Sequence, residues 1–497
     1  MGKSSAAAGS KQVDFVLENG NAATADFAGG DVSPFGGLVL LSLVDDANQF
    51  LARAAKCIKD CRIPAQVKHT VQNLLRQVVL LTAAGYPDGI DSNTFKADKI
   101  LKFCLGWEPD GDQDAASQAS ISRFLTARSK RELLRLFSFF ISFYIWKHKK
   151  PPKSITLDFD GSAIEAHGRQ QYIAFNGHYE INMYFPLFVL DQDGWLIAPI
   201  LRPGNVSDAG ITVDVLRILV KRFRRAWPNV EIILRGDAGF HNPEIMDWCE
   251  SNGVEYILGL KGDHALNVSS QQFDRAAEQA FAREFGEQMF KDESKKKHEL
   301  LREISAQPKA DRRNAYAILD ERQIRKLGEF RHRAGDGFGE NDKRRQKRQW
   351  KQKRRVISLA RVTDKGLKRR YLVTSLEGFT TEHIYDEVYS LRGRAEQCIR
   401  NFKSLGAARL NNHEANTNQF KLLIYGLVYN LFHLFKKELP IALRSLSPET
   451  IMHEFARIAV QIKVSTRRVW LRYTSSYRYT NQALRLIRRL TVLPKPA

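Results

Sequence analysis

Apolar residues recur at helical spacing through the first part of the chain. Between about residues 33 and 150 they return every three or four positions, which is the period of an amphipathic helix. This pattern predicts helices over Leu38–Ala54, Ala65–Ala84, Lys96–Leu105, Ser120–Leu125 and Lys130–Trp146. Before them, a Gly- and Ala-rich stretch contains a possible short strand, Val13–Leu17. Pro151-Pro152 closes the helical region, because proline ends a helix.

Short runs of β-branched and aromatic residues replace this pattern between positions 154 and 260. They predict five strands with two helices between them. The strands are Ser154–Phe159, Met183–Leu190, Trp195–Leu201, Glu231–Leu234 and Glu255–Leu260, and the helices are Asp208–Trp227 and Pro243–Asn252. The order β-β-β-α-β-α-β predicts a mixed five-stranded sheet with flanking helices, and a final helix is expected next.

A polar stretch separates the fifth strand from that final helix. Residues 262–345 are highly charged, and nine of the thirteen residues from Lys343 to Arg355 are Lys or Arg. The elements predicted here are a helix over Gln271–Phe285 and strands over Arg355–Val362 and Arg370–Leu376. Helical periodicity returns only at Tyr385–Lys403. We therefore interpret 262–376 as an insertion domain that interrupts the α/β core.

The charge of the chain indicates a polyanionic partner. Its 77 Lys and Arg residues exceed its 55 Asp and Glu residues, which gives a net charge of +22. The longest apolar runs, Leu136–Trp146 and Leu422–Phe435, are shorter than the ~20 residues of a membrane-spanning helix. Nucleic acid is therefore favoured over a membrane. An odd set of five cysteines indicates a reducing compartment, so we expect a cytoplasmic protein.

One face of the Tyr385–Lys403 helix carries a row of chemically active side chains. The row steps by three or four residues, so its members project from one side of the helix. They are Tyr385, Tyr389, Arg392, Glu396, Arg400 and Lys403. The structural alternative is a solvated face with salt bridges between successive turns.

The spacing Tyr389-x2-Arg392-x3-Glu396-x6-Lys403 resembles the Tyr-Arg-Glu-Lys signature of bacterial insertion-sequence transposases with an Asp-Asp-Glu active site. Two other motifs carry the same resemblance. Asp160-Gly161-Ser162 follows the first predicted strand, and Arg235-Gly236-Asp237-Ala238-Gly239-Phe240 follows the fourth. The resemblance implies a ribonuclease-H-like α/β catalytic core, with α-helical N-terminal and basic helical C-terminal regions around it.

The predicted organisation follows from these patterns together. A flexible tail covers 1–30, and a helical DNA-binding domain covers 31–150. The ribonuclease-H-like core begins at 151–261, is interrupted by the insertion domain 262–376, and is completed by 377–435, which carries the glutamate helix. A basic helical region, 436–497, ends the chain. Its stretch from Ile441 has eleven Lys or Arg residues against two Glu, with aromatic residues between them.

The resemblance implies that Asp160, Asp237 and Glu396 are the catalytic residues and the metal ligands. Two Mg²⁺ ions, with Mn²⁺ as a substitute, need hard oxygen ligands such as these carboxylates. Asp158 competes with Asp160, since alternate strand residues point the same way. Asp160 is favoured because two small residues follow it, as in the resembling families. A strand-terminal Asp can equally be a turn residue without catalytic function.

Residues that hold DNA are implied in the same way. Tyr389, Arg392 and Lys403 resemble the residues that hold DNA phosphates beside the cut, and we add Arg400 because it lies on the same row. Trp350, inside the basic cluster, is a candidate for stacking on an extruded base, with simple packing as the alternative. His167 and His178 are candidate ligands or bases, with a structural role as the alternative.

The implied function is that of a cut-and-paste DNA transposase. It would bind the terminal inverted repeats of its own element, cut their ends, form hairpin intermediates and join 3′-hydroxyls to target DNA. A homodimer on double-stranded DNA and a nucleoid-associated location are expected. Two alternatives stay open: a Mg²⁺-dependent nuclease on the same fold, and a non-catalytic DNA-binding protein derived from a transposase.

Overall fold

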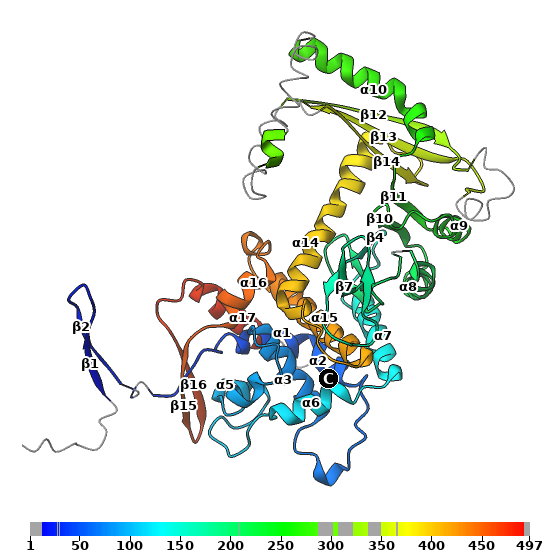
Figure 1. The fold of residues 1–497 in the computed structure, drawn as a ribbon. Helices are drawn as coiled ribbons and strands as arrows, with labels where there is room; N and C mark the ends of the chain where they lie inside the picture. The colour runs from blue at the N-terminus through cyan, green and yellow to red at the C-terminus, as the bar shows by residue number, and fades with distance from the viewer. Residues whose placement is uncertain are drawn as a thin grey trace, which may run out of the picture. The chain divides into compact units, whose positions relative to one another are not determined.

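The computed structural model describes residues 12–26, 28, 30–207, 209–286, 302–306, 322–335, 349–363 and 366–491. The chain forms two compact units (Figure 1). Residues 140–400 make one, and residues 1–139 together with 401–497 make the other. Within the described part of the chain, no helix is both long enough and apolar enough to span a membrane.

The 140–400 unit is built on one mixed sheet with the order β12-β13-β14-β11-β10-β4-β8-β9. Five neighbouring strands correspond to the predicted core. They are β4 (Ser154–Gly161), β8 (Leu187–Asp191), β9 (Leu196–Ile200), β10 (Glu231–Gly236) and β11 (Glu255–Leu260). Strands β4, β10 and β11 are parallel, while β8 and β9 are antiparallel to their neighbours. The mixed sheet with flanking helices is thus confirmed.

The predicted second strand is in fact two strands. β7 (Ile181–Tyr184) ends before Phe185-Pro186, and β8 begins after it. Pro186 has no backbone N–H to donate to a ladder, so the strand breaks there. β7 pairs instead with β5 (Ile164–Glu165) and β6 (Ala174–Asn176) in a separate three-stranded sheet.

The central sheet has eight strands rather than the expected five, because strands from the segment that we interpreted as an insertion extend it. β14 (Gly366–Thr374) pairs antiparallel with β11, and β13 (Arg354–Thr363) and β12 (Gln323–His332) follow. Helix α10 (His264–Phe285) covers this end, where Ala277 and Phe281 pack on Ala360 and Val362. β12 was not predicted, since half of its ten residues are polar and exposed.

Helices α8 (Thr212–Ala226) and α9 (Pro243–Ser251) belong to the same unit. The apolar stripe of α8 is buried, with Val215, Leu219 and Phe223 at most 4% exposed. Asn242 caps α9, because its side chain accepts a hydrogen bond from the N–H of Glu244 and proline follows at the first helical position. These local signals explain why both helices were found from the sequence.

The segment predicted as one helix over Tyr385–Lys403 is helical but irregular. π-helical turns run over His383–Tyr389, a 3₁₀ turn covers Ser390–Arg392, and α14 covers Gly393–Phe402. The change of period rotates the first turns relative to a plain α-helix. Tyr385, expected on the polar row, is therefore buried against Ile257, Ile357 and Leu372 of the sheet.

The second unit is mainly helical. Its N-terminal helices are α1 (Leu38–Asn48), α2 (Phe50–Ala55), α3 (Val71–Ala83), α4 (Asp91–Phe95), α5 (Lys99–Cys104) and α6 (Gln118–Thr126). Gln49 adopts a left-handed conformation, with φ of 51°, and splits the predicted first helix in two. Helix α15 (Ala415–Glu438) is buried along most of its length and packs against α1, α3 and α6.

We had expected the C-terminal region to be helical throughout, but this prediction is wrong. Short α16 (Pro448–Ile451) is followed by a β-hairpin of β15 (Val460–Ser465) and β16 (Arg468–Tyr473), and then by α17 (Thr480–Thr491). Along both strands, apolar residues alternate with mainly polar ones, and this pattern favours a strand over a helix. Near the other terminus, the predicted strand appears as β1 (Val13–Val16), paired with β2 (Ala22–Ala25).

Candidate active site

One guanidinium group joins the three acidic residues that the sequence singled out. A nitrogen of Arg392 lies 2.7 Å from Oε1 of Glu396, and another lies 3.4 Å from Oδ2 of both Asp160 and Asp237. The three carboxylates come from β4, from the turn after β10 and from the first turn of α14. Residues far apart in the sequence therefore converge on one point of the 140–400 unit.

Asp160 occupies the most protected position of the three. It lies inside β4, opposite Phe188 of β8, and its side chain is 10% exposed. The sequence placed it just after the strand, whereas the strand continues to Gly161. The pleat of β4 and the pairing with β8 hold its carboxylate on one face of the sheet.

Asp237 directly follows β10, and its two oxygens have different partners. Oδ1 accepts a hydrogen bond from the N–H of Gly239 at 2.8 Å, which is the turn contact expected of such a residue. Oδ2 faces Arg392. The side chain is 42% exposed, so it is open to solvent on one side. The turn role and the candidate site role are thus served by different atoms.

Gly259 of β11 makes room for this turn. A Cβ atom there would lie 2.7 Å from the backbone nitrogen of Ala238 and 3.0 Å from the hydroxyl of Tyr389. The first atom belongs to the backbone and cannot move aside easily. A glycine is therefore required for close approach at this point. Nothing in the sequence pattern of β11 marked the residue, since the requirement comes from a neighbouring strand.

Asp158 and Asp160 lie two residues apart on β4, but their surroundings differ. Arg235 of β10 binds Asp158 with two hydrogen bonds, Nε to Oδ1 at 2.5 Å and a terminal nitrogen to Oδ2 at 2.6 Å. Both side chains are at most 3% exposed. Burial raises the pKa of Asp158, and the Arg235 charge opposes that rise. Asp158 is thus committed to a closed pair, and Asp160 faces the shared cluster.

Arg235 also contacts the segment that carries Arg392. Its second terminal nitrogen donates a hydrogen bond to the backbone carbonyl of Val388. One buried guanidinium therefore links β4, β10 and the irregular helical turns that lead to Arg392. The sequence showed Arg235 only as part of a motif, because neither of its partners is near it in the chain.

Tyr389 lies at the same cluster. Its ring is half-buried beside Tyr385, and burial raises the pKa of its hydroxyl, with Arg392 opposing the rise and Asp237 adding to it. Burial alone would lower the pKa of Arg392, but the Asp160 and Asp237 carboxylates outweigh this and raise it. The pKa of each side chain therefore reflects both its partial burial and the charges of the cluster.

The other predicted DNA contacts are not gathered here. Arg400 is exposed on α14, two turns beyond Arg392. Lys403 begins the next turn and belongs to the other compact unit. Their roles in holding DNA stay predictions. His167 and His178 are exposed and lie outside the carboxylate cluster.

Trp350 is buried in the packing of its neighbours and is not exposed on the surface. Its ring is fully buried between His241, with centroids 5.6 Å apart, and His332, with centroids 5.5 Å apart, and Arg354 lies over it. In this packing the ring has no free face for a base, so stacking would require the cluster to open. The first part of the predicted basic cluster, 343–348, lies outside the described residues.

The charges of the carboxylate cluster do not balance. Three carboxylates face one guanidinium, which leaves an excess of negative charge at a partly open position. Hard oxygen donors with surplus negative charge are what Mg²⁺ binds in proteins. Among the described residues, no three His, Cys, Asp or Glu side chains are already close enough together to hold a metal ion. The donor types fit a divalent cation, and Arg392 separates the donors.

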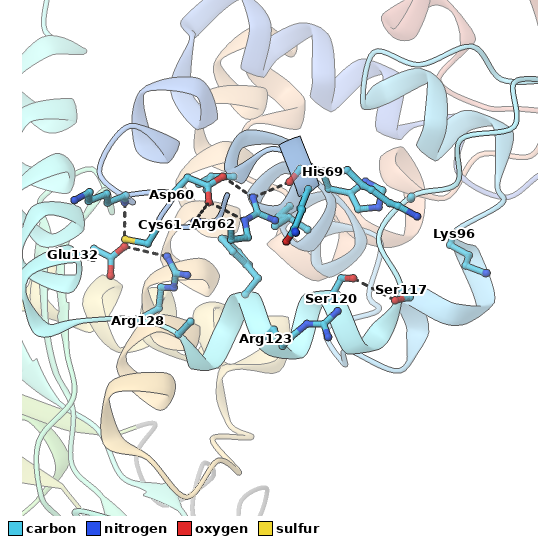
Figure 2. Close-up of a pocket in the computed structure, with 18 of the residues that line it drawn as sticks. Asp60, Cys61, Arg62, His69, Lys96, Ser117, Ser120, Arg123, Arg128 and Glu132 are labelled. Carbon is cyan, nitrogen blue, oxygen red and sulfur yellow. Dashed lines mark hydrogen bonds and ion pairs between the residues drawn. The ribbon is translucent and has the colours of Figure 1, made fainter. Parts of the chain in front are cut away.

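A second candidate surface lies in the other unit. A cavity of about 1370 Å³ lies beside α6 and is lined by residues between Lys59 and Arg135. Figure 2 shows part of this lining. Its acids are largely paired: Asp60 binds Arg62, and Glu132 accepts hydrogen bonds from Ser129 and Arg128. The exposed cations Arg123, Arg131 and Arg135 also line it. The cavity exceeds the usual ligand pocket and has a surplus of positive charge.

Comparisons with known proteins give one strong match. A family model described as "Transposase DDE domain group 1" matches residues 15–495. A search of curated proteins gives no match. Among solved structures, the piggyBac transposase in a synaptic complex with hairpin DNA is 10% identical over 93% of this chain and 82% of that chain, with a TM-score of 0.36.

Two structures of the Mos1 transposase are also similar. A pre-cleavage transpososome is 13% identical over 40% of this chain and 61% of that chain, with a TM-score of 0.15. A paired-end complex with the left transposon end is 14% identical over 52% and 77%, with a TM-score of 0.16. The family match spans nearly the whole chain, and it is the finding that identifies the family.

Proposed function

The chain belongs to the transposase DDE domain family and is a DDE-type transposase, and from this premise we propose that it moves an insertion sequence by cutting and joining DNA. It binds the terminal inverted repeats of its element, cuts their ends in the presence of Mg²⁺, and joins 3′-hydroxyls to target DNA. Hairpin ends and a homodimer on DNA belong to the same proposal, as does a location at the nucleoid.

The observation that carries this proposal is the convergence of Asp160, Asp237 and Glu396 on Arg392. Carboxylates from a strand, a turn and a helix supply the hard oxygen ligands that a pair of Mg²⁺ ions, or Mn²⁺ in their place, requires. Ions held by these residues would supply activation of the attacking oxygen and stabilisation of the leaving one. We assign these three residues as the metal ligands, and Asp158 to its pair with Arg235.

The surrounding residues position the site and bind DNA. Arg392 forms ion pairs with the carboxylates and, when these bind metal, turns its guanidinium to a DNA phosphate, which it can contact with two parallel hydrogen bonds. The Tyr389 hydroxyl donates to the same backbone. Arg235 keeps β4 and the Val388 carbonyl at a fixed separation, so that Asp160 and the helix with Glu396 stay in register. Arg400 and Lys403 extend the phosphate contacts along the helix.

A ribonuclease-H-like core is the fold that we propose for the central five strands. Their order β9-β8-β4-β10-β11, with three parallel strands and an antiparallel hairpin, supports it. Asp160 on β4 and Asp237 after β10 lie on adjacent parallel strands, which is where two ligands of such a core are needed. The inserted strands form part of the surface on which Tyr385 packs, and so they support the helix with Glu396.

The cationic cavity beside α6 supports DNA binding by the N-terminal region. Phosphates are attracted to exposed arginines whose charge is not neutralised by neighbouring acids. Arg123, Arg131 and Arg135 fit that description, while Arg62 and Arg128 are paired with acids. We propose that this surface contacts the backbone of the repeat DNA.

A cleavage assay tests the proposal. The full chain is incubated with a duplex that carries the inverted repeat flanking its gene, with Mg²⁺ or with chelator. We expect nicks at the repeat end only with Mg²⁺, and joining of the new 3′-hydroxyl to a target plasmid. Glu396→Gln should bind the duplex and not cut it, while Glu387→Gln, an exposed glutamate of the same helical segment, should cut normally.

The two alternatives predict different products. Nicking without any joined product would indicate a nuclease. Repeat binding without cleavage would indicate a DNA-binding protein that has lost catalysis, although an intact set of three carboxylates beside an arginine argues against it. Equal cleavage by wild type and Glu396→Gln would contradict our assignment of the site.

A further inference from the structure

The C-terminal hairpin is a two-sided ribbon. β15 and β16 pair antiparallel, with Gln461 opposite Arg472, Lys463 opposite Trp470 and Ser465 opposite Arg468. Because side chains alternate between the faces of a strand, opposite residues share a face. One face therefore collects Gln461, Lys463, Ser465, Arg468, Trp470 and Arg472. The other face collects apolar residues, of which Val460 and Ile462 are buried.

The base of the ribbon is fixed to the rest of its unit. β15 pairs with β3 (Val32–Ser33), and the Tyr473 hydroxyl donates a hydrogen bond to the carbonyl of Gly36 at 3.0 Å. Gly37 lies so close to the backbone carbonyl of Phe455 that no Cβ fits between them. The polar face is thus held by a packed base and does not depend on the strands alone.

The polar face is cationic and contains no acid. Lys463, Arg468 and Arg472 surround Trp470, whose side chain is 50% exposed. The sequence from Phe455 to Ala497 has ten Lys or Arg residues and no Asp or Glu. The cations of this face therefore have no acid within their own segment to neutralise them.

A half-exposed tryptophan between cations suits unpaired nucleotides better than a closed duplex. Bases stack on aromatic rings while cations follow the phosphates, and this arrangement tolerates any sequence. In an intact duplex the base faces are already covered by their neighbours, so the indole would add nothing. The structural alternative is that Trp470 only covers the aliphatic part of Lys463 on the paired strand.

We infer that this face of the ribbon binds single-stranded DNA, with an unpaired base stacked on Trp470 and phosphates held by Arg468, Arg472 and Lys463. The inference rests on the proposed function, because cutting and joining at the ends of an element expose unpaired nucleotides. It assigns to the ribbon a task separate from recognition of the repeat duplex.

Fluorescence anisotropy with the full chain tests this assignment. The probes are a labelled mixed-sequence single strand and the corresponding duplex, each titrated at several salt concentrations. Trp470→Ala should weaken single-strand binding about tenfold or more, since one stacked base contributes about 1–3 kcal/mol, and should leave duplex binding within about twofold. Trp470→Tyr, which keeps an aromatic face, should restore most of the affinity.

The cations of this face should affect a different quantity, the salt dependence of single-strand binding. Arg468→Gln combined with Arg472→Gln should reduce the salt slope of single-strand binding by about 1.4, because each phosphate contact contributes about 0.7. Two variants in the other unit serve as controls and should change neither quantity. They are Trp146→Ala, a tryptophan that is 41% exposed, and Arg217→Gln, an exposed arginine of α8.

Specific outcomes would overturn the inference. Unchanged single-strand binding by Trp470→Ala would do so, as would Trp470→Tyr being as weak as Trp470→Ala. Equal losses on single strand and duplex would show a general cationic surface instead. If the wild type cuts repeat ends while Trp470 has no effect, only the ribbon assignment fails. If the ribbon binds single strands but the wild type never cuts, the proposed function fails and the ribbon assignment stands.

Discussion

Arg235 and Arg392 both bind carboxylates at the central sheet, yet they form opposite kinds of cluster. Arg235 is buried and pairs with a single carboxylate, that of Asp158, through two short hydrogen bonds. Arg392 meets three carboxylates at once, two of them at 3.4 Å, and two of the three are about half-exposed. The closed pair is electrically balanced, whereas the open cluster has negative charge to spare.

This difference gives the two aspartates of β4 different roles: Asp158 belongs to a structural pair, and Asp160 belongs to the candidate active site. A balanced, buried pair has little capacity for another cation, and its loss is costly because one charge is left buried. An unbalanced, partly open cluster can take up cations and exchange its partners. The two aspartates of β4 are thus distinguished by their arginines and not by their position along the strand.

The largest expected effect comes from the open cluster. Asp160→Asn should reduce Mg²⁺-dependent cleavage by a factor of about a thousand or more, because metal ions supply several kcal/mol of transition-state stabilisation. DNA binding and the melting temperature should change little. Cleavage of the repeat duplex under single-turnover conditions measures the effect. Asp193→Asn, an exposed aspartate of the β8–β9 turn, is the matched control.

Breaking the closed pair should cost stability instead. Arg235→Leu leaves Asp158 buried without a partner, and we expect the 140–400 unit to lose about 3–5 kcal/mol. Adding Asp158→Leu should recover most of the loss, since the pair is then replaced by apolar side chains. Urea unfolding followed by tryptophan fluorescence measures both. A loss for the single variant of under about 1 kcal/mol would show that the pair is not closed.

Acid should destabilise the packed cluster around Trp350. Burial lowers the pKa of His241 to about 4, and the charge of Arg354 adds to this. The unfolded chain binds this proton near pH 6.5, so the contribution is complete above that pH and is lost as the pH falls towards 4. The loss should reach roughly 2–3 kcal/mol.

The pH effect requires a variant for comparison, because Asp191 acts in the opposite direction. Burial raises the pKa of Asp191 to about 6, so its contribution falls as the pH rises through that value. In thermal unfolding, His241→Gln should lose less stability than the wild type when the pH is lowered from 7 to 4.5. Parallel curves for the two proteins would mean that His241 is protonated in the folded state.

The smallest expected effect tests whether Arg392 stands between the carboxylates. Arg392→Gln removes their counter-charge, so in chelator the unit should lose about 1 kcal/mol because the site is partly exposed. Mg²⁺ should then stabilise the variant more than the wild type. Differential scanning fluorimetry with and without Mg²⁺ measures this, with Arg217→Gln as the control. Equal Mg²⁺ responses in both proteins would mean that Arg392 does not compete for the site.

The elements around the site were largely predictable because their signals are local. Helix α8, the proline that opens α9 and the strands that lead to Asp160 and Asp237 were all visible as periodicity or turn residues. The spacing from Tyr389 to Lys403 identified the glutamate helix. Convergence of Asp160, Asp237 and Glu396 was expected from the order of the strands and the family resemblance.

What the sequence could not show depends on contacts between distant residues. The partner of Asp158 is an arginine on the neighbouring strand, and the need for Gly259 comes from Ala238 on another element. Tyr385 was assigned to the polar row because a regular 3.6-residue period was assumed, and the π-helical turns rotate it into the core. The hairpin with Trp470 was expected to be helical, since its many arginines masked the alternation of its strands.

Iron-directed cleavage of the protein chain tests the central claim most directly, namely that Asp160, Asp237 and Glu396 form one cation site. Fe²⁺ binds oxygen ligands in place of Mg²⁺. With hydrogen peroxide it generates hydroxyl radicals that cut nearby backbone, and ascorbate reduces the resulting Fe³⁺ back to Fe²⁺. We predict cuts at the end of β4, after β10 and at the start of α14 together, suppressed by excess Mg²⁺ and absent in Glu396→Gln. Cuts at only one of these positions, or at all three in Glu396→Gln, would contradict the claim.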